Sequence, residues 1–205
     1  MTHKTLTKEA SRKKLAYPPG DFAIWIVIYV ELLTFGLLFM GYIFSRRSDV
    51  ELFNASQLVL SQTSGFVNTL ILITSSYFVA KAVQSIKSML KEQQKSANTL
   101  SSKWILSAMF LGLVFLGIKI WEFSHIFSMG ITLSTNSFFM FYLMLTMFHF
   151  MHVMLGLIIM FNIYQKMRLH GYSLADHSGL ETGASYWHLV DLLWIVLFPF
   201  IYILR

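Results

Sequence analysis

Five long apolar runs divide the chain, at about residues 22–44, 64–82, 104–125, 138–164 and 184–204. A run of about 18 or more apolar residues is long enough to cross a bilayer as a helix. The connecting segments are short, so the pattern predicts an all-α integral membrane bundle of five transmembrane helices. We expect residues 21–205 to form a single membrane domain that follows a basic tail at 1–20. The first run is too long for the core of a signal peptide, and we expect it to stay in the mature protein.

Polar and turn-forming residues set the expected ends of these helices. Asp21 follows a Pro-Pro-Gly sequence and is the predicted N-cap of the first helix. Val83, Ile86 and Leu90 recur at helical spacing, so the second helix should continue beyond its apolar run. Serine, asparagine and glutamine residues at 93–102 predict a loop before the third run.

The distribution of basic residues predicts the orientation of the bundle. Twelve lysines and arginines lie in the N-terminal tail and around the second-to-third and fourth-to-fifth connections, whereas Arg46, Arg47 and Arg205 lie on the other side. Because positive charge is retained on the cytoplasmic side, we expect a cytoplasmic N-terminus and an external C-terminus. No aromatic or motif context accompanies the lysines, so the net charge of +6 does not indicate a nucleic-acid partner.

The chain contains no cysteine. This excludes disulfides, c-type haem attachment, iron–sulfur clusters and thiolate copper sites. Any metal would have to be bound by histidines and carboxylates.

Acidic residues inside the apolar runs are the first candidates for function. An ionisable side chain at the bilayer centre costs roughly 2.5–3.5 kcal/mol on insertion scales, so it usually faces a protein interior or a water-filled path. Glu31 lies nine residues into the first run, roughly 14 Å deep at ~1.5 Å per residue. Glu122 lies toward the outer end of the third run. We predict that both are buried and linked to protons; a structural role for Glu31, and pairing of Glu122 with Lys119, are the alternatives.

A second set of polar residues lies on the last two apolar runs. His149 and His152 are three residues apart and therefore share a helix face. If the last helix begins near Glu181, His188 and Asp191 lie at a similar depth. We predict that these residues form a polar seam between the fourth and fifth helices.

Three further residues are interpreted as packing residues. Asn68 in the second run should hold neighbouring helices together, because a buried amide in a bilayer seeks a polar partner. Trp187 and Trp194 of the last run should pack within the bundle.

Two redox readings of these residues are possible. The sequence Glu122-x-x-His125 has the form used in di-iron carboxylate bundles, but it occurs once, and Glu31 and Asp191 lie deeper. A haem bound by His152 and His188 is the other reading, and nothing else in the sequence marks a haem pocket. We therefore predict no catalytic residue, no metal ligand and no redox cofactor.

The sequence resembles subunit III of the haem–copper oxidases. The stretches FHFMHVMLGLIIM (148–160) and LETGASYWHLVDLLWIVLF (180–198) resemble the two C-terminal helices of that family, and VNTLILITSS (67–76) resembles its Asn-Thr helix. Glu31 and Glu122 fall where the family keeps a membrane-buried glutamate and a Glu-aromatic pair. The first helix and the ending VDLLWIVLFPFIYILR are most like the short, five-helix branch encoded with bacterial nitric oxide reductases (NorE). Pro199 and the Leu-Arg ending depart from oxidase subunit III proper.

This resemblance implies an accessory, non-redox membrane subunit and not an enzyme. Such a subunit packs on a catalytic haem-containing subunit in the bacterial cytoplasmic (inner) membrane, binds phospholipid, and supports proton access, gas access or stability of the catalytic subunit. The branch implies nitric oxide reductase and denitrification as the context. Subunit III of a terminal cytochrome c or quinol oxidase is the alternative. The rival class is an independent membrane enzyme, or a haem or metal carrier that uses His149, His152 and His188. A transporter is disfavoured because the sequence has no inverted repeat.

Overall fold

The computed structural model describes residues 21–88, 93–173 and 176–204, and this part of the chain is helical with short connections. The elements are α2 (Phe22–Ser48), α3 (Val50–Gln57), α4 (Gln62–Lys87), α5 (Gln94–Ser128), α6 (Ser137–Arg168), α7 (Ser178–Phe198) and the π-helical turn η2 (Pro199–Ile203). Five of the described helices are long and apolar enough to cross a membrane. The predicted all-α, five-helix architecture is confirmed, whereas the basic tail at 1–20 lies outside the described residues.

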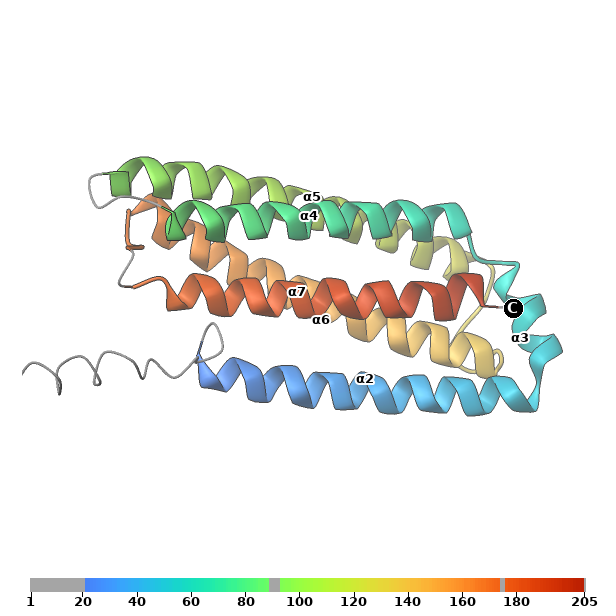
Figure 1. The fold of residues 1–205 in the computed structure, drawn as a ribbon. Coiled ribbons are helices and arrows are strands. Elements are labelled where there is room, and N and C mark those ends of the chain that lie inside the picture. The colour runs from blue at the N-terminus through green and yellow to red at the C-terminus, as the bar shows by residue number, and fades with distance from the viewer. Residues whose placement is uncertain (1–20, 89–92, 174–175, 205) are drawn as a thin grey trace, which may run out of the picture.

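Successive long helices run in opposite directions along the bundle (Figure 1). Helix α7 contacts α2, α4 and α6, so it occupies the centre of the arrangement, while α5 packs against α4 and α6. The short helix α3 lies at the end of the bundle that also holds the C-terminus (Figure 1). The connection from α5 to α6, at 129–136, lies at the same end, whereas α4 and α6 end, and α5 and α7 begin, at the opposite end (Figure 1).

The predicted loop at 93–102 is wrong. Residues 94–102 form the first turns of α5, although most of their side chains are polar. Asn98 donates a hydrogen bond of 2.9 Å to the carbonyl oxygen of Tyr172, and Ser101 donates one of 2.9 Å to that of Ala82. Tertiary partners therefore satisfy polar side chains that would otherwise favour a loop.

Helix capping follows the sequence in some places and not in others. Ser61 and Asn136 cap α4 and α6, because their side-chain oxygens accept hydrogen bonds from the backbone of Ser64 and Phe139. Asp21 precedes α2, but its side chain makes no capping hydrogen bond, and its backbone N–H donates to Thr182 of α7 instead. The predicted N-cap role of the Asp21 side chain is therefore wrong.

Side chains from other helices satisfy the carbonyl groups at the C-terminal end of the bundle. The last carbonyls of a helix have no partner within it. Tyr42 donates a hydrogen bond of 2.9 Å to the carbonyl oxygen of Phe200, Gln57 donates one of 3.1 Å to that of Ile201, and Gln62 donates one of 2.8 Å to that of Tyr202. These contacts tie η2 to α2, α3 and α4, and fix the depth of the last turn.

Candidate functional site

The polar side chains within the membrane-spanning helices gather in three places. The first is a pair between α2 and α6, where Oε2 of Glu31 lies 3.0 Å from Nε2 of His152. The other ring nitrogen of His152, Nδ1, lies 2.7 Å from the carbonyl oxygen of Phe148 one turn earlier. If Nδ1 donates to this carbonyl, Nε2 is the atom that can exchange a proton with Glu31.

Glu31 is only partly buried, with 21 % of its side chain exposed, against 9 % for His152. The rings of Phe35 and Phe148 cover the imidazole on its other sides, at centroid distances of 5.6 and 4.6 Å. The carboxylate of Glu31 is thus the more accessible member of the pair.

The second place is a fully enclosed ion pair on α5. Nζ of Lys119 lies 3.3 Å from Oε2 of Glu122, and the two residues are 0 % and 5 % exposed. Tyr142 of α6 donates a hydrogen bond of 2.7 Å to Oε1 of Glu122, and Tyr202 of η2 donates a second to the same oxygen. We refer to Lys119, Glu122, Tyr142 and Tyr202 as the ion-pair cluster.

Aromatic rings complete the surroundings of the Lys119 ammonium. The ring centroids of Phe123, Tyr142, Trp194 and Tyr202 lie 5.0–5.7 Å from Nζ. Nζ also donates a hydrogen bond of 3.0 Å to the hydroxyl of Tyr202. A buried ammonium is therefore held by one carboxylate, one hydroxyl and several ring faces, which are the contacts that offset the loss of water.

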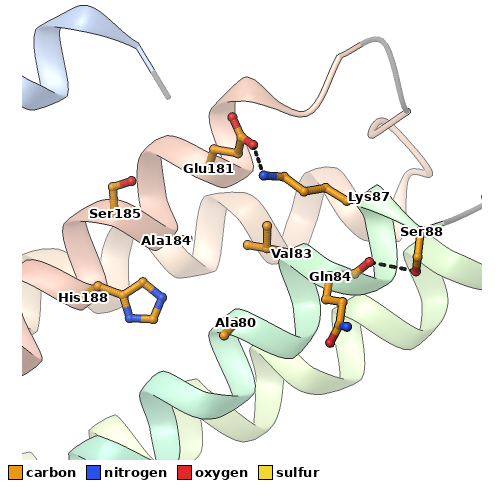
Figure 2. Close-up of a pocket in the computed structure, with 9 residues that line it drawn as sticks. All are labelled: Ala80, Val83, Gln84, Lys87, Ser88, Glu181, Ala184, Ser185 and His188. Atoms are coloured by element: carbon orange, nitrogen blue, oxygen red, sulfur yellow. Dashed lines mark hydrogen bonds and ion pairs between the residues drawn. The ribbon is translucent and has the colours of Figure 1, made fainter. Parts of the chain in front are cut away.

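The third place is a groove between α4 and α7, with a volume of about 480 Å³ (Figure 2). At its mouth, Nζ of Lys87 lies 2.5 Å from Oε1 of Glu181. At its deeper end, Nδ1 of His188 lies 2.5 Å from Oγ of Ser76 and 3.6 Å from Oδ2 of Asp191. We call this feature the α4–α7 groove.

His149 lies in the core between these places and is fully buried. Its ring packs on Trp194 of α7 at 5.2 Å and against the edge of Phe115 of α5 at 5.7 Å. Neither of its ring nitrogens has a hydrogen-bond partner among the described residues, and the same holds for the side-chain amide of Asn68. His149 is thus placed as an aromatic packing residue.

The contacts of the five predicted seam residues do not follow the α6–α7 interface. His152 turns to α2, while Glu181 and His188 turn to α4. Asp191 contacts His188 on its own helix, and His149 is the member whose ring meets α7. The single seam is corrected to separate contacts because α7 touches three helices and its polar residues point to different neighbours.

The predicted packing tryptophans are buried, with Trp187 at 1 % and Trp194 at 0 % exposure. Trp187 fits against two glycines, since a Cβ atom at Gly112 or Gly156 would lie 2.9 Å from its ring. The indole N–H of Trp194 donates a hydrogen bond of 3.0 Å to Thr69 beside Asn68.

Sequence reasoning missed the two tyrosines of the ion-pair cluster. Tyr202 stands two residues before the end of an apolar run, where a tyrosine is typical of the membrane interface. Tyr142 lies among many aromatic residues of α6 and has no distinguishing spacing. Lys119 was the available signal, because a lysine within an apolar run requires several polar or aromatic neighbours.

The arrangement offers little for binding a redox metal. Among the described residues, no group of three or more histidine, aspartate or glutamate side chains lies close enough to hold a metal ion. His152 and His188, the pair considered for a haem, face different helices, α2 and α4. What the three places can do chemically is hold, share and exchange protons.

Comparison with known proteins identifies the relatives of this chain. The family described as cytochrome c oxidase subunit III matches residues 21–205. Cytochrome c oxidase subunit 3 of Thermostichus vulcanus is 31% identical over 202 residues, covering 92% of this chain and 90% of the relative. A probable quinol oxidase subunit 3 of Staphylococcus saprophyticus is 28% identical, covering 90% of this chain and 89% of the relative. A heme-copper oxidase subunit I+III of Aeropyrum pernix is 28% identical, and the match covers 88% of this chain and 22% of that longer protein.

Proposed function

The chain belongs to the cytochrome c oxidase subunit III family, and from this premise we propose that it is an accessory membrane subunit of a terminal oxidase. The family match over residues 21–205 carries the proposal. The partner is the catalytic, haem-containing subunit I, as the name of the fused Aeropyrum relative suggests. In this proposal the catalytic residues and the redox cofactors belong to the partner subunit.

The names of the relatives favour oxygen over nitric oxide as the substrate of the complex. The three relatives described above are named as subunits of cytochrome c, quinol or heme-copper oxidases. They therefore agree with the alternative drawn from the sequence, subunit III of a terminal oxidase. The branch associated with nitric oxide reductase and denitrification has only the sequence of the first helix and the C-terminal sequence with Pro199 in its favour.

Purification of the complex tests the accessory role. A tagged chain, extracted in mild detergent, should retain a haem-containing catalytic subunit that consumes oxygen, and the chain separated from it should contain neither haem nor stoichiometric metal. Haem or metal in the separated chain would overturn the accessory reading. Consumption of nitric oxide instead of oxygen by the purified complex would restore the nitric oxide reductase branch.

We place the subunit in the bacterial cytoplasmic membrane with its N-terminus in the cytoplasm. The asymmetry of lysine and arginine residues supports this orientation. Reporter fusions after Arg47 and after Asn136 should report the outside, and a fusion after Lys95 the inside. The opposite pattern would overturn the orientation.

Within the complex, Glu31 and His152 are the residues that we assign a proton-linked role. The pair has zero net charge both as carboxylate with imidazolium and as carboxylic acid with neutral imidazole, so a proton can move between the two groups without placing net charge in the membrane. The 3.0 Å separation and the exposure of Glu31 support this assignment. Glu122, by contrast, is enclosed with Lys119, and its role is to hold α5, α6 and η2 together.

Bound phospholipid is the remaining part of the proposal. Large apolar side chains cover the exposed face of α2, including Val30, Leu33 and Leu37. Such a face suits acyl chains or an apolar surface of the catalytic subunit. Lipid analysis of the purified complex should find phospholipid that remains after detergent washing and is lost when the subunit is removed.

A further inference from the structure

The α4–α7 groove begins at the end of the bundle where α4 ends and α7 begins. Its mouth lies between Lys87 and Glu181, and its floor reaches His188 (Figure 2). His188 is ten residues after the start of α7, which corresponds to about 15 Å along the helix. The groove thus joins the surface of the bundle to a histidine near the middle of a hydrocarbon core about 30 Å thick.

Polar groups occur at the mouth, on the wall and at the deep end of the groove, although most of its exposed lining is apolar. The Lys87–Glu181 ion pair forms the mouth, and Ser185 lines the wall of the groove one turn before His188. Small side chains, Ala80 and Ala184, leave the space between the two helices open.

The exposure of His188 requires a polar environment. About two fifths of its side chain is accessible, at 41 %, whereas its neighbour Asp191 is 11 % exposed behind it. Nδ1 of His188 has Ser76 and Asp191 beside it, but the exposed remainder of the ring would face hydrocarbon. Because a polar group in hydrocarbon without a partner is costly, lipid is an unfavourable occupant of the deep end. The groove volume of about 480 Å³ holds several waters, each of which takes about 30 Å³ of liquid volume.

We propose that the α4–α7 groove is a water-filled inlet that keeps the His188–Asp191 pair in proton exchange with the aqueous phase at its mouth. The imidazole takes the excess proton of a hydronium ion in the groove, which forms an N–H bond and leaves a neutral water molecule, and the resulting cation is stabilised by the Asp191 carboxylate. Release of the proton to water reverses the step. Ser76 on α4 faces the ring, and the charged groups at the mouth are Lys87 and Glu181. The inlet does not depend on which catalytic subunit the chain joins.

Cysteine labelling tests the presence of water, because the chain has no native cysteine to give a background. Ser185→Cys places a thiol in the groove, and Val30→Cys places one at a similar depth on α2, where the side chain is 54 % exposed. Both variants are made in the assembled complex in inside-out membrane vesicles and treated with a charged methanethiosulfonate. The groove thiol should react at least about tenfold faster, because the reactive thiolate forms in water and not in hydrocarbon.

Each other outcome overturns the inlet. Equal rates, or no reaction at Ser185→Cys, would exclude water from the groove. Labelling of Ser185→Cys by an uncharged maleimide alone would identify an acyl chain as the occupant. Labelling that appears only after the complex is dissociated would identify a segment of the partner.

Histidine modification tests access to His188 itself. Diethyl pyrocarbonate should modify His188 and the exposed His125 in the complex but spare the fully buried His149. Ser185→Trp should fill the groove, lower the rate at His188 at least about tenfold through loss of solvent access, and leave the rate at His125 unchanged. An unchanged rate at His188 in this variant would show that the ring is reached by another route and would overturn the proposal.

Discussion

Replacing Glu122 by leucine would leave the Lys119 ammonium buried without a counterion. At the observed 3.3 Å separation and an effective dielectric constant of about 20, the attraction between the two charges is about 5 kcal/mol. Desolvation costs several kcal/mol for each ion, so the net contribution of the intact pair is small. Loss of one partner alone removes the attraction but not the cost of the remaining charge, and Glu122→Leu should therefore destabilise the subunit by about 3–5 kcal/mol.

The double variant Lys119→Met with Glu122→Leu removes both buried charges. It should be more stable than Glu122→Leu alone, because no unpaired ammonium remains. The hydroxyls of Tyr142 and Tyr202 lose their Glu122 acceptor in both variants, so that cost does not affect the comparison. Unfolding by sodium dodecyl sulfate in mixed micelles, followed by circular dichroism, gives the two free energies. Glu51→Leu on the exposed side of α3 is the control for removing a carboxylate and should change stability little.

Two results would refute this reasoning. If the double variant were less stable than Glu122→Leu, the lysine would be contributing stability without its partner. If Glu122→Leu cost less than about 1 kcal/mol, Lys119 would have to reach water or lose its charge in the folded subunit.

Three further outcomes are expected. A hydrophobic carbodiimide should label Glu31, the carboxylate with 21 % side-chain exposure, and mass spectrometry should show the label lost in Glu31→Gln; equal labelling of that variant would place the reactive acid elsewhere. Gly156→Ala should destabilise the subunit by about 1–3 kcal/mol, because the added Cβ would lie 2.9 Å from the ring of Trp187. Gly117 has open space around it, so Gly117→Ala should not destabilise the subunit in the same micelle assay. Burial and the Asp176 carboxylate raise the pKa of Tyr172, in the α6–α7 connection, from 10.0 to about 12. The neutral phenol therefore stabilises the fold below pH 10, and this contribution is lost as pH rises through 12. An ultraviolet absorbance titration compared with Tyr172→Phe measures the pKa of this phenol, and a transition near pH 10 would contradict the prediction.

The apolar runs were sufficient to predict the five long helices, because a bilayer leaves a continuous apolar segment few other structures. The errors fall where segments are polar and depend on tertiary contacts. Residues 94–102 are helical because partners such as Ala82 and Tyr172 accept hydrogen bonds from their side chains. The short helix α3 was not predicted, since eight residues of mixed polarity carry too weak a periodicity.

For the candidate sites, the sequence identified many of the residues but not their partners. Spacing within one helix was informative, and the suggested pairing of Lys119 with Glu122 is observed. Partners on other helices depend on how each helix is rotated, which a uniformly apolar sequence does not specify. For this reason His152 was assigned to the wrong neighbouring helix, and Tyr202 could not be distinguished from an interfacial tyrosine.

The rotation of α2 is set by polar contacts more than by apolar packing. Its most apolar window is 11% buried, against 56% for the last helix, and apolar side chains gain little from leaving lipid for another apolar surface. Four contacts hold it at three depths: the Asp21 backbone at one end, Glu31 near the middle, and Tyr42 and Arg46 at the other end. The Glu31–His152 pair is the one that lies within the hydrocarbon core, so the pair for which we propose a proton-linked role also positions the most peripheral helix. A change in the charge state of this pair would therefore be transmitted to the exposed face of α2, which is the surface we assign to lipid or to the catalytic subunit.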